Sequence, residues 1–156
     1  AISRALKPER IIIGTSSNEI SKKYKIFLKK FNCPIIKMNY ESAELTKISI
    51  NMYLISSVTT TNKMAEICEK LGANWSDIIP ALQLDNRIGK HAYLKPGLGI
   101  SGGNLERDLF TISNIKNNYN LDGSLFQSWN KISEYKKSWA WKKLKSFKNI
   151  IRKFDF

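Results

Sequence analysis

Cysteine and histidine are scarce in this sequence of 156 residues. Two cysteines, Cys33 and Cys68, are too few for the framework of a disulfide-stabilised protein. The one histidine, His91, excludes a His-rich metal site and the HExxH zinc motif, and it argues against a Ser-His-Asp triad. Because CxxC pairs and EF-hand loops are also absent, the sequence predicts no metal site.

Long hydrophobic runs are missing as well. The longest segment without a charged residue lies between Lys47 and Lys63, and it is short and rich in Ser, Thr and Asn. It is therefore not expected to span a membrane. Charges at Arg4, Lys7 and Glu9 leave no apolar core for a secretory signal, so a reducing cytoplasm is the expected compartment.

Acidic residues are few: 13 Asp and Glu stand against 26 Lys and Arg, which gives a net charge of +13. Residues 124–156 hold nine basic and two acidic side chains, or +7 of this excess. Zinc-finger, RNP-like and homeodomain-like patterns are absent, so no nucleic-acid partner is predicted. Two explanations of the excess positive charge remain open: it lies on Lys-rich helix faces that are simply solvated, or it forms a basic C-terminal helix that binds an anionic partner.

The first 40 residues have the pattern of a short β-α-β unit. The run RIIIG at 10–14 predicts a buried strand, and Ser16 with Glu19 forms a capping-box pattern before an amphipathic helix at about 17–31. Pro34 and the following IIKM predict a second strand. Two parallel strands do not make a stable sheet, so the rest of the sheet is expected to come from elsewhere.

The rest of the chain is predicted to be mainly helical around one long central helix. Residues 42–71 contain neither Gly nor Pro, and Gly72 stands where a helix-ending glycine belongs. The middle of this helix is apolar on more than one face, which predicts burial all round and a homodimer interface. Shorter helices are expected at about 75–83, at 105–119 and from 124 onward.

A glycine-rich loop at 85–104 separates two of these helices and contains five of the eight glycines. It is neither a GxGxxG turn nor a P-loop, but it allows the backbone to approach a ligand closely. Lys47 and Asn51 share one face of the long helix, and Asp108 falls in the first turn after the loop. From spacing alone, these residues fit both a binding site and ordinary surface positions.

Four segments, taken in order, resemble the UDP-glucose/GDP-mannose dehydrogenase family. The long helix SAELTKISINMYLISSVTTTNKMAEIC resembles the family's S-A-E-[LM]-x-K-x-x-x-N, which is followed by a downstream Asn. The loop LDNRIGKHAYLKPGLGISGGNLERDL resembles R-I-G…P-G-[FL]-G-[FY]-G-G-S-C-[FL]-x-K-D. The segment PERIIIG at 8–14 and the stretch from about 134 to 150 complete the likeness.

The resemblance implies an enzyme that oxidises the C6 hydroxyl of a nucleotide sugar to a carboxylate with NAD. Family members have an NAD-binding Rossmann domain, a central helical domain and a nucleotide-binding third domain. The expected division is therefore 1–40 as the remnant of the NAD-binding domain, 41–125 as the dimerisation and substrate domain, and 126–156 as a linker helix. On this basis the isolated chain has no cofactor-binding residues, is not expected to bind NAD and is expected to be inactive.

The resemblance also assigns roles to individual residues. Lys47 falls on the active-site lysine, Asn51 on its companion asparagine and Asp108 on the aspartate that assists water activation. The positions expected to contact the sugar nucleotide are Arg87, Tyr93, Lys95 and Gly99, with Arg87 reaching the substrate of the partner subunit.

Asn104 is a departure, because it falls on the family's nucleophilic cysteine. Cysteine forms a thiohemiacetal and then a thioester, and an amide cannot be acylated in that way. Oxidation through a hydrated aldehyde, release of the aldehyde and a different task on the same scaffold all remain open. A second hypothesis is a non-catalytic helical dimer whose basic C-terminal helix binds an anionic partner.

Overall fold

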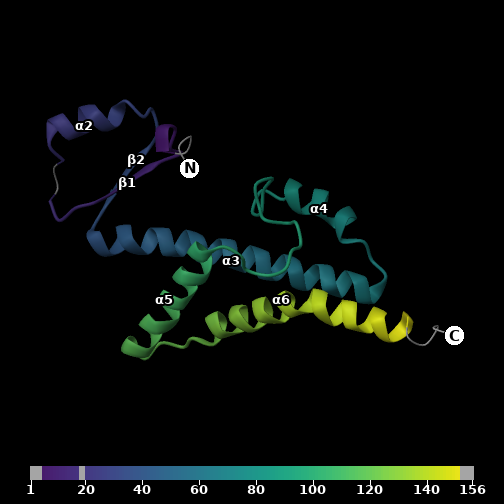
Figure 1. Ribbon diagram of the computed structural model, residues 1–156. Helices are drawn as coiled ribbons and strands as arrows, with labels where there is room; N and C mark the ends of the chain where they lie inside the picture. Colours follow the sequence, from purple (N-terminus) through teal and green to yellow (C-terminus); the bar gives the residue numbers. More distant parts are fainter. Residues whose placement is uncertain (1–4, 18–19, 152–156) are drawn as a thin grey trace. The chain divides into compact units, whose positions relative to one another are not determined.

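A computed structural model describes residues 5–17 and 20–151. It confirms a mostly helical fold with a long central helix and two short strands early in the chain (Figure 1). The chain divides into two compact units, Ala1–Ser49 and Ile50–Phe156. The elements in order are β1 (Ile11–Gly14), α2 (Lys22–Lys29), β2 (Ile35–Met38), α3 (Tyr40–Leu71), α4 (Trp75–Leu84), α5 (Gly103–Tyr119) and α6 (Ser124–Ile151).

In the first unit, the two predicted strands pair in parallel. The register places Ile11 opposite Ile35 and Gly14 opposite Met38. Parallel strands require a crossover connection, which α2 provides here. The predicted β-α-β order is therefore confirmed.

Helix α2 is shorter than predicted. The Ser21 hydroxyl accepts the Tyr24 amide at 3.3 Å, so the helix begins at Lys22 rather than at about 17. The start predicted from the capping-box pattern is thus wrong, because Ser21 supplies the cap. Glu19 of that pattern lies outside the described residues.

Helix α3 begins after Asn39, whose side chain accepts the Ser42 amide at 2.9 Å, and it runs without a break to Leu71. Gly72 follows with φ +72°, as expected for a residue that ends a helix in the left-handed region. The middle of α3 is not buried on all sides within one chain: Ile55 is fully buried, whereas Tyr53 is 79% exposed. Since the predicted burial includes a subunit interface, it stays a prediction, and in the single chain Tyr53 is the part of this region that a partner would have to cover.

The core of the second unit forms where α3 meets α4. Ala65 and Cys68 of α3 pack with Trp75, the first residue of α4. The indole Nε1 of Trp75 donates to the carbonyl of Leu94 at 2.8 Å, which attaches the following loop to this core. Other apolar side chains packed against the cluster are Ile78, Ile79 and Leu82.

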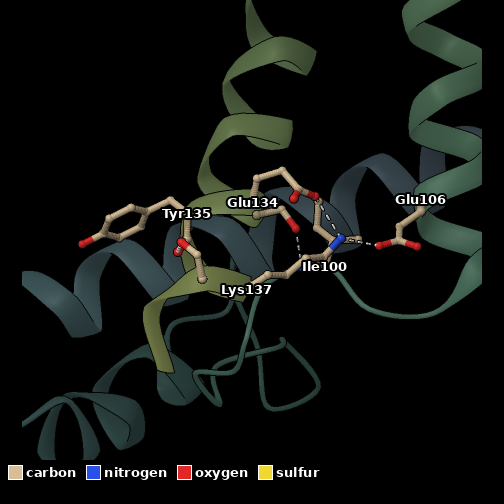
Figure 2. Close-up of polar contacts among 7 residues, drawn as sticks. Ile100, Glu106, Glu134, Tyr135 and Lys137 are labelled. Atoms are coloured by element: carbon tan, nitrogen blue, oxygen red, sulfur yellow. Dashed lines mark hydrogen bonds and ion pairs between the residues drawn. The ribbon is translucent and has the colours of Figure 1, made fainter. Parts of the chain in front are cut away.

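Helices α5 and α6 pack beside each other through apolar and charged contacts. Leu109 of α5 and Ile100 of the preceding loop are almost completely buried. At the rim, the Lys137 ammonium reaches Glu106 of α5 at 2.7 Å and Glu134 at 3.0 Å (Figure 2). These carboxylates, Glu106 first, raise the pKa of Lys137. Because all three side chains are substantially exposed, the ion pairs fix orientation more than they add stability.

Within the part of the chain that the structure describes, no helix combines the length and apolarity that a membrane span needs.

Candidate functional site

The centre of the site is a hydrogen bond between two residues that are 57 positions apart in the sequence. Asn51 of α3 donates from Nδ2 to Oδ2 of Asp108 in α5 at 2.6 Å. Both residues belong to the second unit. The fold therefore brings together two of the four residues that the sequence places at catalytic positions.

The Asp108 carboxylate is held from two sides. Its side chain is 7% exposed, and its other oxygen, Oδ1, accepts from Nε of Arg107 at 3.2 Å. The carboxylate thus has a hydrogen-bond donor on each oxygen, one from an amide and one from a guanidinium. Since Asn51 donates through its nitrogen, its carbonyl oxygen is the end that can accept a hydrogen bond from a substrate hydroxyl or a water.

Asn104 and Lys47 each stand four residues before a member of this pair in the sequence. Asn104 is the second residue of α5, is exposed, and precedes Asp108 by four residues. Lys47 is exposed and precedes Asn51 by four residues on α3, within the first unit. Residues four apart on a helix share a face, so Asn104 lies on the same face of α5 as Asp108.

The segment Tyr93–Ile100, which we call the glycine loop, is attached to α3 by two polar side chains. The Thr61 hydroxyl donates to the Tyr93 carbonyl at 2.7 Å. The Asn62 side-chain oxygen accepts the Gly97 amide at 2.7 Å. Among the described residues, the Asn62 side-chain nitrogen has no hydrogen-bond acceptor although it is buried.

The far end of the glycine loop is attached to α6. The Ile100 amide donates to the Ser133 hydroxyl at 2.9 Å. The preceding Gly99 has φ +99°, and a Cβ atom at that position would lie 2.8 Å from the Ser133 carbonyl oxygen. Glycine is required here both for the backbone conformation and for the close approach to α6.

The side chains predicted to contact substrate are on the outside of this loop. Tyr93 is 48% exposed, Lys95 is exposed, and both line a hollow of about 320 Å³ together with Val58 and Ile79. Gly99, the third predicted position of this segment, is not one of the residues that line the hollow. A hollow lined by a cationic, an aromatic and several aliphatic side chains can hold a ligand with charged and apolar parts.

Arg87 lies in the turn after α4 and is engaged by its own neighbour. Its guanidinium makes two hydrogen bonds to the Asp85 carboxylate, at 2.7 and 3.0 Å, while its side chain is 90% exposed. These bonds hold the pKa of Asp85 below and the pKa of Arg87 above their ordinary values. Arg87 is therefore at the surface, and its ion pair with Asp85 is of the exposed kind that contributes little stability.

Two residues that position the glycine loop had no predicted role, Thr61 and Ser133. They are 2% and 3% exposed. A sequence signal exists for the first: the polar run TTTN at 59–62 interrupts a helix segment that is otherwise apolar on its buried side. Buried polar side chains normally have a specific hydrogen-bond partner, and here the partner is the loop backbone.

Comparison with known proteins agrees with this arrangement. Residues 41–135 match the model of the UDP-glucose/GDP-mannose dehydrogenase family, central domain. UDP-glucose 6-dehydrogenase of Rickettsia typhi is 30% identical over 135 residues, which cover 82% of this chain and 30% of the relative. UDP-glucose 6-dehydrogenase TuaD of Bacillus subtilis is 34% identical over 115 residues, 74% of this chain and 25% of the relative.

A solved structure extends the likeness to the fold. A UDP-glucose dehydrogenase from the hyperthermophilic archaeon Pyrobaculum islandicum superposes with a TM-score of 0.74 at 26% identity, covering 86% of this chain and 31% of that one. The chain therefore spans about 30% of the length of relatives such as these. Since the family model matches well over half of the residues, and the paired Asn51 and Asp108 lie inside the matched region, the chain belongs to the UDP-glucose/GDP-mannose dehydrogenase family and contains its central domain.

Proposed function

We propose that this chain is the middle part of a longer NAD-dependent nucleotide-sugar 6-dehydrogenase, with UDP-glucose as the first substrate to test. Residues 1–40 would complete an NAD-binding domain, 41–125 would form the substrate and dimerisation domain, and 126–156 would lead to a nucleotide-binding domain. The observation that carries the proposal is the Asn51–Asp108 hydrogen bond, which joins two separate family motifs in one buried polar pair.

NAD is assigned to residues outside this chain. The turn that follows β1 lacks the GxGxxG pattern of a phosphate-binding βα turn. When bound in the complete enzyme, NAD accepts a hydride from C6 of the sugar. The residues of this chain would hold the sugar and manage the proton and the developing charge on oxygen.

Three residues would act on the reacting oxygen. The Lys47 ammonium would stabilise negative charge there, as a preorganised cation does in a transition state. The Asn51 carbonyl oxygen would orient the C6 hydroxyl or the attacking water. The Asp108 carboxylate would fix Asn51 through the 2.6 Å hydrogen bond and would accept a proton during water activation.

The substrate would lie along the outside of the glycine loop. Tyr93 offers an aromatic face and Lys95 a positive charge for the diphosphate. Gly99 allows the backbone to come close to the ligand. Arg87 would exchange its exposed contact with Asp85 for an anionic group of the substrate in a partner subunit.

We further propose that Asn104 occupies the position of the family's catalytic cysteine and that oxidation proceeds without an acyl-enzyme. In the complete enzyme, NAD⁺ would supply the oxidant for both oxidations. Asn51 would orient the water that adds to the aldehyde, and Asp108 would accept a proton from this water, so that a hydrate and not a thioester would be oxidised to the carboxylate. Without a thiol, the second oxidation is slow or the aldehyde is released.

A homodimer is the proposed assembly, formed through α3. Exposed apolar residues recur along this helix at helical spacing, at Tyr53 (79% exposed), Met64 (40%), Ile67 (40%) and Leu71 (78%). A stripe of this kind, left uncovered in one chain, is typical of an interface between helices.

Product analysis of the full-length enzyme tests the proposal. The wild type is expected to form NADH with at least one nucleotide sugar, and hydroxylamine should divert the free aldehyde. Asn104→Cys should speed acid formation, because the neighbouring groups are already in place. Efficient oxidation to the acid by the wild type through a trapped covalent intermediate would contradict the role of Asn104.

A further inference from the structure

The glycine loop is fixed at both ends by buried hydroxyl groups from two different helices. At one end, Thr61 of α3 donates to the Tyr93 carbonyl at 2.7 Å. At the other, Ser133 of α6 accepts the Ile100 amide at 2.9 Å. Ile100 itself is 2% exposed, so its amide has little access to water.

Burial makes these two contacts decisive for the loop backbone. Thr61 and Ser133 are 2% and 3% exposed. If the Ser133 hydroxyl is removed, the buried Ile100 amide loses its partner, and if the Thr61 hydroxyl is removed, the partly buried Tyr93 carbonyl loses its partner. The loop then has to move in order to satisfy that group.

Ser133 restrains two successive loop residues. Its hydroxyl takes the Ile100 amide, and its main chain lies against Gly99, where no side chain fits. A loop held in this way can neither slide along α6 nor lift from it without losing a buried contact.

Between the two ends, exposed side chains form an outer side of the loop. Lys95 is exposed and Leu98 is 57% exposed, whereas Leu94 packs against the core of the second unit. A ligand would meet this outer side, whereas Thr61 and Ser133 contact the loop from within the helical unit.

We propose that Thr61 and Ser133 are positioning residues for nucleotide-sugar binding. They act through the glycine loop and do not touch the ligand. Together they hold Tyr93 and Lys95 in the arrangement that the substrate recognises. This inference rests on the proposed function, since it assumes that the outer side of the loop is the binding surface.

The test compares Thr61→Val, which keeps the shape but removes the donor, with Thr61→Ser, which keeps the donor. Ser133→Ala removes the second contact, and Thr111→Val serves as a control on the exposed side of α5, where the hydroxyl bonds only within its helix. Two readouts are needed: hydrogen exchange of the peptide covering 93–100, and steady-state kinetics of the full-length enzyme with UDP-glucose.

Thr61→Val and Ser133→Ala should each raise exchange of the loop peptide, while peptides from α4 and α5 stay protected. The KM for UDP-glucose should rise about tenfold with kcat changed much less, since one lost hydrogen bond corresponds to about a factor of ten in affinity. Thr61→Ser and Thr111→Val should match the wild type in both readouts.

Several results would overturn the inference. Equal behaviour of Thr61→Val and Thr61→Ser would show that the hydroxyl does not matter. Faster exchange throughout the second unit would show that the two hydroxyls have a general structural role. Faster exchange of the loop peptide with an unchanged KM would show that the position of the loop does not affect substrate binding. If the wild type oxidises no nucleotide sugar, the proposed function fails and the ligand role with it, and the exchange data alone decide whether these residues hold the loop.

Discussion

Replacing Gly99 with alanine should destabilise the second unit through a contact that can be located in the structure. At φ +99° the new Cβ would lie 2.8 Å from the Ser133 carbonyl oxygen and 2.9 Å from its hydroxyl oxygen. The first of these atoms belongs to the backbone of α6 and cannot rotate away. The alanine therefore meets both conformational strain and a steric clash.

The size of the effect follows from these two parts. A non-glycine residue at positive φ costs about 1–2 kcal/mol. Overpacking a buried contact adds about 1–3 kcal/mol. The free energy of unfolding should therefore fall by about 2–5 kcal/mol in Gly99→Ala.

Two neighbouring glycines separate these contributions. Gly102 has φ +97° but nothing within 4 Å of an added Cβ, so Gly102→Ala should show the conformational part alone, about 1–2 kcal/mol. Gly97 has neither a positive φ nor a close neighbour, so Gly97→Ala should be neutral or stabilising by about 0.4–1 kcal/mol.

Urea denaturation followed by tryptophan fluorescence measures all three variants. The comparison should be made at one protein concentration, because a dimer makes apparent stability concentration-dependent. If Gly99→Ala loses no more stability than Gly102→Ala, the result would contradict the close packing of Gly99 against Ser133.

Three further predictions use the same chain. Asn51→Ala should lower the free energy of unfolding by about 1.5–3 kcal/mol in denaturant titrations, because the buried Asp108 carboxylate loses a hydrogen bond; an unchanged midpoint would contradict the pairing. The Tyr135 hydroxyl donates to the Glu66 carboxylate at 2.8 Å and lowers the pKa of Glu66 below its ordinary value of 4.5. Tyr135→Phe should therefore lower the free energy of unfolding near neutral pH. The difference in stability between this variant and the wild type should shrink as the pH falls below about 4.5, where Glu66 becomes protonated. Ile67→Glu should convert the proposed dimer into monomers in sedimentation velocity, and a wild type that stays monomeric at high concentration would refute the interface on α3.

The fold could be predicted from sequence wherever local chemistry decides it. Gly72 ends α3 at the expected place, and Asn74 caps α4 by accepting the Ser76 amide at 3.1 Å. The predicted start of α2 is wrong because Ser16 also fits a capping pattern in the sequence, and only the hydrogen bond to the Tyr24 amide identifies Ser21 as the cap. Burial all round the middle of α3 stays a prediction, because it depends on a second chain that no local pattern places.

The candidate site was only partly accessible from sequence. Spacing places Asn51 and Asp108 on their helices, but their hydrogen bond depends on how α3 and α5 pack. Ser133 has no local signal at all, since a serine on a basic amphipathic helix is usually a surface residue. Its role follows from tertiary packing against Gly99, which no local pattern encodes.

The central claim is that the Asn51–Asp108 pair belongs to the active site of a nucleotide-sugar dehydrogenase. The most direct measurement is NADH formation from UDP-glucose by the full-length enzyme, as the wild type, as Asp108→Asn and as the control Asp77→Asn at an exposed position in the first turn of α4. Wild type and control should be equally active, and Asp108→Asn should lose about 10²–10⁴ in kcat, the usual effect of removing a general acid–base group. Full activity of Asp108→Asn, or no NADH from the wild type with any nucleotide sugar, would contradict the account.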